Sequence, residues 1–486
     1  MAHSPLNPRI VELPADQPGV ISQAEILSAL SYALDLTEGA VPGHALRSCL
    51  IGMRLGKELG LSSDWLASLY YALMLKDVGC SSNAGRLCQI LGGGDERRVK
   101  SGVKLEDWTR PERPKLSTIR LLWNTVLPRA NPVQRVAGMI KIGLTQHKNN
   151  AEVIGLRCDR GARILARLGL GDVAANAVRH LDEHWDGSGY PDRLRERDIP
   201  QDARILAVAQ HLDVFATERG RTAAIQVLRE RSGRWFDPEI VRIAERLHSD
   251  GSLWRHALAN TPQDDTRMAV LDLAPDTMHH LRATDVDLIC AAFADVVDAK
   301  SSFTYRHSLG VTEAAVQIAQ QLHLGRERVQ MVRRAALLHD VGKLSVPNSI
   351  LDKPWKLDAE EWQRIYEHPR LSRQILSRIK TFGELAVVAG QHHERLDGSG
   401  YPDHLKADQL PLESRLVAVA DVYGALTEER PYRAGLAPDV AFGIMAKDVP
   451  HRIDPTCFEA LQAAVTAHAA REKVMEMPGL QPQESL

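Results

Sequence analysis

The sequence of 486 residues lacks long hydrophobic runs. No stretch approaches the roughly 20 consecutive apolar residues that cross a bilayer, and the first residues lack the basic-then-apolar order of a secretion signal. Charge of one sign is not in excess either: the net charge is −2, which provides no basic field to hold a nucleic-acid polymer. We therefore expect a cytoplasmic protein that binds neither membrane nor nucleic acid, with residues 1–20 as a flexible leader.

Cysteine is also sparse. The six cysteines are scattered and include no C-x-x-C pair, which indicates reduced thiols rather than disulfides. Hydrophobic residues make up 44% and charged residues 25% of the chain, as in ordinary globular proteins. At about 100–200 residues per domain, this length predicts two to four domains.

What the chain does contain is an imperfect internal repeat. HALRSCLIGMRLGKELGL, from His44, aligns without a gap with HSLGVTEAAVQIAQQLHL, from His307. Further on, HLDEHWDGSGYP (180–191) aligns with QHHERLDGSGYP (391–402). The unequal spacing requires an insertion in the first copy around 81–150, where LGGGDERRVK and TRPERPKL are loop-like in composition.

Apolar residues in both copies recur at helical spacing, and strand-like alternation is scarce, so an all-α fold of two helical bundles is expected. We place the first copy at 21–259, a linker at 260–277, the second copy at 278–475 and a tail at 476–486.

The second copy contains imidazole and carboxylate side chains beside apolar helical runs such as AALLHD, LAVVAGQHH and LVAVAD. Ionisable groups are rarely placed in a helical core unless something pairs with them. A divalent cation would do so, and several imidazoles with carboxylates suit Fe, Mn, Zn or Ni rather than Ca. The candidate metal ligands are His307, His339, Asp340, His368, His392, His393 and Asp421.

LHDVGKLSVPNSILDKPWKL, the HP pair at 368–369, HHERLDGSGYP and VAVADVYGALTEERPYR occur in this order and resemble the HD-GYP domains, a branch of the HD phosphohydrolases. The resemblance covers about 285–460. It implies an all-α bundle that holds two or three metals, usually iron or manganese, and hydrolysis of cyclic di-GMP to pGpG and sometimes GMP. The chain would then be two tandem HD-type bundles, the first degenerate.

The resemblance also implies roles for single residues. One metal would be held by His307, His339, Asp340 and Asp421. Asp340 would bridge to a second metal, held by His368 and His392, with His393 completing the site. Some family members bind a third metal through a Glu four positions before the first His; Phe303 stands there, so two divalent ions, Fe or Mn, are expected.

Catalytic and substrate-binding groups follow in the same way. Asp340 would take part in catalysis at a bridged metal pair that ionises a shared water, and Lys343 would present a positive charge to the phosphate. The resemblance implies that Arg430 and Arg433 hold the substrate phosphates. The turn DGSGYP carries no obvious catalytic group and is interpreted as structural.

The first copy keeps the frame but not the ligands. His44 and Asp77 remain, whereas Lys76 replaces His339, Leu181 and Asp182 replace the two adjacent histidines, and Gln210 replaces Asp421. An ammonium at Lys76 would repel a divalent ion. We therefore expect no metal in this half and a role in packing, dimerisation or sensing.

Two alternatives stay open at this stage. The protein could be an HD-type phosphohydrolase for another nucleotide, such as cyclic GMP-AMP, or a non-enzymatic nucleotide-sensing module. The expected partners are cyclic di-GMP or a related cyclic dinucleotide and, for protein contacts, diguanylate cyclases or a second copy of the chain.

Overall fold

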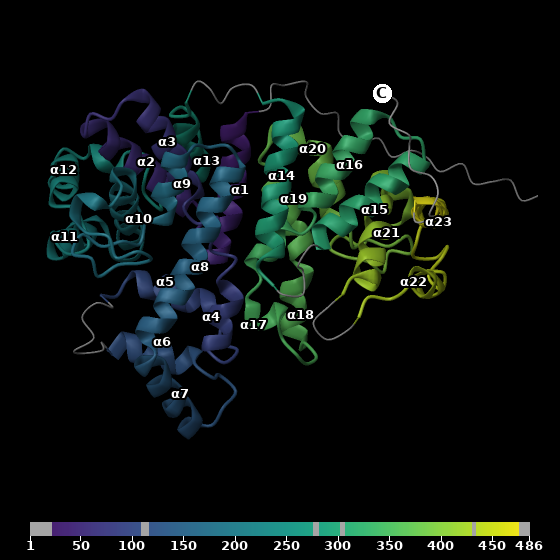
Figure 1. Ribbon diagram of the computed structural model, residues 1–486, viewed down its shortest axis with the longest axis horizontal. Helices are drawn as coiled ribbons and strands as arrows, with labels where there is room; N and C mark the ends of the chain where they lie inside the picture. The colour runs from purple at the N-terminus through teal and green to yellow at the C-terminus, as the bar shows by residue number, and fades with distance from the viewer. Residues whose placement is uncertain (1–21, 108–115, 276–280, 302–306, 430–433, 476–486) are drawn as a thin grey trace, which may run out of the picture. The chain divides into compact units, whose positions relative to one another are not determined.

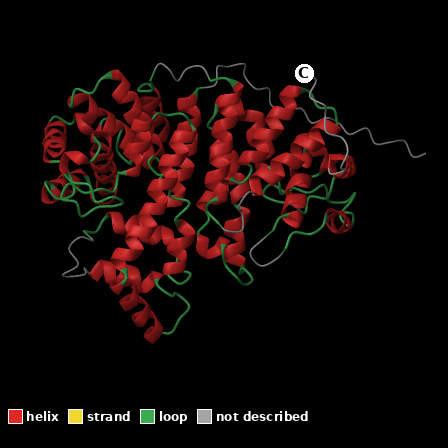
Figure 2. Cartoon of the chain, in the orientation of Figure 1, coloured by secondary structure: helices red, strands yellow, loops and turns green. Residues whose placement is uncertain are grey.

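The computed structural model describes residues 22–107, 116–275, 281–301, 307–429 and 434–475 (Figure 1). Across these ranges the regular elements are helices, with two isolated β-bridges and no strand (Figure 2). The predicted all-α fold is confirmed. The chain divides into two compact units, which we call the N-terminal bundle (described residues of 18–305 and 341–368) and the C-terminal bundle (described residues of 306–340 and 369–486).

The C-terminal bundle is built around α15, which packs against α16, α21 and α23. The buried stripe of α15 contains Val311, Ala315 and Ile318, as its helical spacing predicts. The helices of this unit are α15 (His307–Gln321), α16 (Arg326–Leu338), α19 (His368–Leu376), α20 (Gly383–Gly390), α21 (Leu412–Thr427), α22 (Pro438–Met445) and α23 (Pro455–Met475), with 3-10 turns η5 (Lys380–Phe382) and η6 (Ala407–Gln409).

The N-terminal bundle repeats this centre with α2, which packs against α3 and α10. Its first helix starts where the Ser22 side chain accepts the backbone N–H of Glu25 and ends at Gly39, whose φ of 65° favours glycine. The helices are α1 (Gln23–Glu38), α2 (His44–Glu58), α3 (Ser63–Leu75), α4 (Ala84–Ile90), α5 (Glu96–Lys104), α6 (Leu116–Thr125), α7 (Pro132–Leu144), α8 (Gln146–Arg167), α9 (Asp172–Arg179), α10 (Gln201–Arg219), α11 (Arg221–Arg231), α12 (Pro238–Ser249), α13 (Gln263–Leu271), α14 (Ala283–Asp298), α17 (Asn348–Leu351) and α18 (Ala359–Tyr366), with 3-10 turns η1 (Glu196–Asp198), η2 (Ser252–Trp254) and η4 (Val341–Ser345).

The insertion differs from its predicted loop character. The sequence ERRVK lies in α5, so the loop expected from the neighbouring glycines is wrong there. Helices α4, α6 and α7 and the first part of α8 occupy most of the remainder. The helices of the insertion are stabilised by tertiary packing, because α5 and α6 are in contact beside a buried apolar cluster of Leu91, Val99 and Val126.

The segment expected to link the copies contains α13, which packs against α1 and α2 of the N-terminal bundle. The two units also cut the chain after Asp340 and after His368 rather than once at the linker. The sequence-based boundaries at 260–277 therefore stay a prediction. The expected leader, 1–20, and the expected tail, 476–486, lie outside the described residues.

Candidate metal centre and active site

Four of the predicted ligands meet at the ends and middle of the central helices of the C-terminal bundle. His307 opens α15, His339 and Asp340 follow α16 directly, and Asp421 lies in α21. Nε2 of His307 lies 3.1 Å from Oδ1 of Asp421 and 3.9 Å from Oδ2 of Asp340. Nε2 of His339 lies 3.3 Å from Oδ2 of Asp340 and 3.8 Å from Oδ1 of Asp421. All four residues are buried, so the cluster lies within the bundle.

The two adjacent histidines join the same cluster just after α20. Nε2 of His392 lies 3.6 Å from Oδ1 of Asp340, and Nδ1 of His393 lies 3.4 Å from Oδ2 of Asp421. Asp340 therefore has an imidazole near each of its oxygens, the position that a bridging carboxylate requires.

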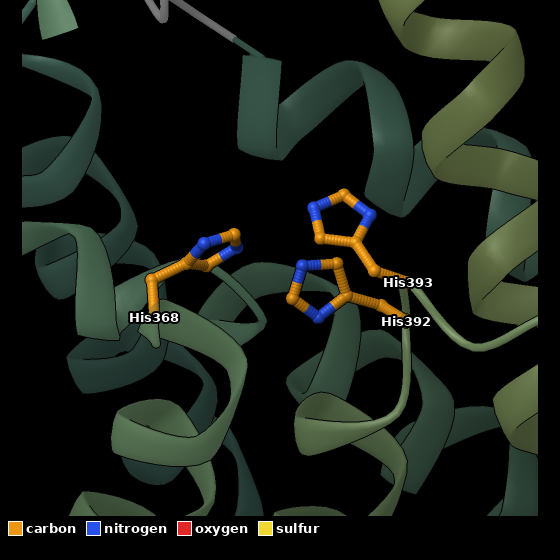
Figure 3. A group of neighbouring side chains, drawn as sticks. All are labelled: His368, His392 and His393. Carbon is orange, nitrogen blue, oxygen red and sulfur yellow. The ribbon is translucent and has the colours of Figure 1, made fainter. Parts of the chain in front are cut away.

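His368 is the first residue of α19, a helix whose other residues belong to the C-terminal bundle. Ser372 of α19 donates a hydrogen bond of 2.6 Å to the backbone oxygen of His339, which fixes this helix to the end of α16. One ring nitrogen each from His368, His392 and His393 lies within 4.8 Å of the others, and the three rings approach one another in Figure 3. The side chains singled out in sequence order are thus neighbours in space.

Hydrogen bonds fix the ring orientation of three of these histidines in the same way. Nδ1 of His339, of His392 and of His368 each donates to the backbone oxygen three residues earlier, at 2.7, 2.7 and 2.6 Å. In the neutral ring, Nε2 is then the unprotonated nitrogen and can act as a ligand. Metal-binding histidines characteristically make such a bond with their second nitrogen.

The residues fit a divalent cation. Nε2 of His339 is buried and, among the described residues, makes no contact of hydrogen-bond geometry, although Oδ2 of Asp340 lies 3.3 Å away. A buried polar atom of this kind is costly unless something pairs with it. Ligand atoms of His307, His339 and Asp421, and again of His339, Asp340 and His392, lie within 4.8 Å of one another. Imidazole and carboxylate donors together suit a borderline divalent metal.

The charges of the cluster reinforce one another. Burial by itself lowers the pKa of His307, but hydrogen bonds with Asp421 and Glu428 outweigh it and raise this pKa to about 10. Burial likewise opposes ionisation of Asp421, yet the bond with His307 and the nearby His393 hold the pKa of its carboxyl well below its usual range. The site therefore favours a charged carboxylate facing positive charge.

One contributing residue was missed by the sequence analysis. Oε2 of Glu428 accepts a hydrogen bond of 2.8 Å from Nδ1 of His307. This side chain has room because two glycines stand beside it: a Cβ at Gly310 would lie 2.7 Å from its Oε1, and a Cβ at Gly424 would lie 3.4 Å from the same atom. Nε2 of His307 is left to face Asp421, so Glu428 orients a ligand rather than binding the metal.

In the N-terminal bundle the corresponding glycine positions carry Arg47 and Asp213, and these two side chains form an ion pair of 2.6 Å. Asp213 also accepts the Nδ1 bond of His44, at 2.6 Å. Burial and the charge of Lys76 lower the pKa of His44 to about 4, the opposite of the shift at His307. The pKa of the aligned histidine is therefore lowered in the N-terminal bundle and raised in the C-terminal bundle.

Two lysine side chains of the N-terminal bundle pair with the buried carboxylates of Asp77 and Glu38. Lys76 contacts Asp77 directly, and Lys104 lies 3.0 Å from Glu38. Ligand atoms of Glu38, Asp77 and Cys80 do lie within 4.8 Å of one another. Burial and the adjacent carboxylates raise the pKa of the Cys80 thiol, however, which keeps it protonated and a poor metal ligand.

The positions equivalent to His368 and His393 are replaced by a pair of opposite charges. Arg157 forms an ion pair with Asp182. Where the C-terminal bundle brings imidazoles together, the N-terminal bundle has a guanidinium and a carboxylate that neutralise each other.

In each copy, a buried glutamate accepts hydrogen bonds from the backbone that directly follows the DGSGYP turn. Glu394 accepts the backbone N–H groups of Asp403 and Leu405, at 2.7 and 3.0 Å. Glu183 accepts those of three successive residues, Asp192 to Leu194, at 2.6, 3.0 and 3.1 Å. This glutamate explains why the turn survives in a half that lacks the imidazoles.

The roles predicted for the remaining residues stay predictions. Lys343 lies in η4, directly after the His339–Asp340 pair, and its catalytic role stays a prediction. Arg430 and Arg433 lie outside the described residues, as does Phe303, on which the expected number of metals depends.

Buried imidazoles and carboxylates that converge in an all-α bundle fit a metal-dependent phosphohydrolase, and the family comparison agrees with this class. The sequence model of the HD domain family matches residues 144–240 and 291–457. The chain is 39% identical over 448 residues to 3′3′-cGAMP-specific phosphodiesterase 3 of Vibrio cholerae serotype O1, covering 91% of this chain and 94% of the relative. The chain belongs to the HD-GYP branch of the HD phosphohydrolases, the family that its motifs resemble.

A crystal structure of a cyclic GMP-AMP specific phosphodiesterase from V. cholerae superimposes with a TM-score of 0.62 at 35% identity, covering 92% of this chain and 98% of that one. The cyclic di-GMP phosphodiesterase response regulator RpfG of Xanthomonas campestris pv. campestris is 42% identical over 155 residues, which cover 31% of this chain and 40% of that relative. Among the described residues, no helix is long and apolar enough to span a membrane.

Proposed function

We propose that the protein is a metal-dependent phosphodiesterase that hydrolyses a cyclic dinucleotide, with 3′3′-cGAMP as its substrate. The observation that carries the proposal is the convergence of Asp340 and Asp421 with buried histidines in the C-terminal bundle. The sequence alone favoured cyclic di-GMP. Similarity along both halves of the chain to a cGAMP-specific enzyme supports the alternative better than the shorter similarity to a cyclic di-GMP enzyme.

In this proposal one divalent ion would be held by His307, His339, Asp340 and Asp421. A second would be held by His368, His392 and His393, with Asp340 shared between the two. Bound there, such a pair would supply an ionised water and charge stabilisation for the phosphate. The backbone hydrogen bonds of His339, His368 and His392 keep each Nε2 aimed at the centre. Glu428 does the same for His307 through its second nitrogen.

Lys343, Arg430 and Arg433 are proposed to bind the phosphates of the substrate. A lysine ammonium acts as a point charge, whereas a guanidinium can contact two phosphate oxygens at once. Hydrolysis of one phosphodiester bond would add water across P–O, release the 3′ oxygen as a hydroxyl and give a linear dinucleotide.

The N-terminal bundle is proposed to be a degenerate copy of the same fold that holds no metal. Its support is the ion pairing of Lys76 with Asp77 and of Arg157 with Asp182 at the positions of metal ligands. These internal charges replace the cation that the C-terminal ligands require.

A turnover panel tests the substrate. The protein, purified anaerobically and loaded with iron or manganese, is incubated with 3′3′-cGAMP, cyclic di-GMP and cyclic di-AMP, and products are separated by chromatography. We expect the highest kcat/KM for 3′3′-cGAMP and no turnover by Asp340→Asn. A higher kcat/KM for cyclic di-GMP would contradict the substrate assignment, and bound metal without turnover of any nucleotide would favour a sensing module.

A further inference from the structure

A cavity of about 880 Å³ lies within the N-terminal bundle, and its lining residues come from α4 to α8, α10 and α11 and from the segments beside them. Figure 1 labels these helices. It is separate from the residues proposed to bind metal. Ligand sites are typically cavities of about 300–1,000 Å³ with mostly apolar walls and a few placed polar groups. Six of the apolar side chains that line this one are Leu91, Val99, Leu121, Leu122, Met139 and Ile142.

Arg231, the last residue of α11, provides a charged group at the cavity wall. Its side chain is 5% exposed, and its Nη1 is buried without a hydrogen-bond partner among the described residues. Leaving a buried nitrogen of a charged group without a hydrogen-bond partner is costly. The fold therefore retains an arginine whose hydrogen-bonding capacity is not satisfied by the side chains that surround it.

Aromatic rings hold this guanidinium but do not satisfy it. Its Cζ lies 4.1 Å from the centre of the Trp235 ring and 5.3 Å from that of Phe215. Cation–π contacts of this kind stabilise the charge of the guanidinium, but an aromatic ring offers no lone pair to an N–H group. The rings therefore supply no acceptor for Nη1 of Arg231.

Two other charged residues that line the cavity, Asp107 and Glu230, have hydrogen-bonding or ionic partners within the protein. Asp107 lies 2.8 Å from Arg234 in an ion pair, and Glu230 accepts a hydrogen bond of 2.9 Å from Gln226. Glu106 and Arg219 also line the wall. Arg231 is distinguished from the other two lining arginines because its Nη1 is both buried and without an acceptor.

We propose that this cavity binds a single-chain amphiphile whose anionic head group pairs with Arg231 and whose apolar tail lies along the insertion helices. A guanidinium matches a carboxylate or phosphate oxygen pair, and charge-assisted bonds of this type are strong in buried surroundings. The leucine, valine, isoleucine and methionine side chains of the wall suit a hydrocarbon tail. The site requires neither the metals nor the substrate of the C-terminal bundle.

Isothermal titration of the full chain with dodecanoate, dodecyl phosphate and the neutral dodecanamide, each below its aggregation concentration, tests the proposal. We expect one anionic probe per chain, with dodecanamide bound at least about tenfold more weakly, since a charged hydrogen bond would be lost. The response to dodecanoate and to dodecyl phosphate tells a carboxylate head from a phosphate head.

Arg231→Met keeps the apolar stem that packs between the rings and removes the charge, and it should weaken anion binding by about tenfold or more. Arg231→Lys should retain part of the affinity. Arg229→Met is the matched control on the same helix, because Arg229 is exposed and pairs with Glu245; it should bind as the parent does. Met139→Trp should block the tail and reduce binding of every probe.

Turnover at the C-terminal site is measured in parallel as a check of folding and should be unchanged in Arg231→Met. Absence of saturable anion binding by the parent chain would overturn the proposal, as would equal affinity of the parent and Arg231→Met or equal affinity for dodecanamide. Because binding is read by heat, its outcome does not depend on whether the protein hydrolyses a cyclic dinucleotide.

Discussion

Nδ1 of His307 donates a hydrogen bond of 2.8 Å to the carboxylate of Glu428, a residue that follows the last turn of α21. This bond leaves Nε2 of His307 directed at Asp421, 3.1 Å away. Partners of this kind typically change metal affinity by about 10–100-fold when they are removed.

Glu428→Ala should therefore lower the affinity for the divalent metal by about 10–100-fold and reduce turnover at limiting metal. Excess metal should restore most of the activity, because the ligands themselves remain. Metal affinity is measured by competition with a chelator, with the exposed neighbour Glu429→Ala as control. Unchanged affinity in Glu428→Ala would show that the bond does not orient His307.

The paired glutamates under the two turns give a second prediction. Glu394→Ala and Glu183→Ala each leave part-buried backbone N–H groups without their acceptor, and each should lower the free energy of unfolding by about 1–3 kcal/mol. Only Glu394→Ala should also lower turnover, because its turn follows His392 and His393. Denaturant unfolding and steady-state kinetics measure the two effects; equal losses of turnover would refute the division of roles between the bundles.

A feature could be predicted from the sequence where neighbouring residues determine it, and not where residues distant in the sequence do. The all-α fold could be predicted because apolar spacing is a local pattern, and the HD and HH pairs singled out side chains that lie close together in the structure; the repeat and the metal-binding roles stay predictions. Glu428 could not be predicted, because its partner His307 is 121 positions away and its space depends on the glycines at 310 and 424. Nor could α5, since its stability comes from packing against α6 and not from propensity.

The substrate could not be predicted from the ligands for a different reason. Imidazole and carboxylate groups act on the phosphodiester, which is common to all cyclic dinucleotides. The bases must be recognised by side chains other than the metal ligands. The sequence-based prediction of cyclic di-GMP named no such side chain, so it rested on the family resemblance alone.

A third prediction concerns the segment that follows Asp340 and carries Lys343. The carboxylate of Glu96 in α5 is fully buried and accepts the backbone N–H of Asn348, with its two oxygens at 3.0 and 3.2 Å. Arg97 donates to the backbone oxygen of Ser345 at 2.6 Å. The insertion of the N-terminal half thus holds the backbone that follows the His339–Asp340 pair.

Glu96→Ala should lower the free energy of unfolding by about 1–3 kcal/mol and reduce kcat while the metal content of the folded protein stays at the parent level. The neighbouring Arg98→Ala, whose side chain is exposed, should change neither quantity. If kcat is unaffected in Glu96→Ala, the contact is structural alone.

The central claim is that the metals belong to the C-terminal bundle and not to its N-terminal counterpart. Metal content per chain, measured on anaerobically purified parent, Asp340→Asn and Asp77→Asn proteins, tests it most directly. The account predicts two ions in the parent and in Asp77→Asn, even though the latter is destabilised by leaving Lys76 buried without its carboxylate, and a loss of metal together with turnover in Asp340→Asn. Metal retained by Asp340→Asn but lost from Asp77→Asn would contradict it.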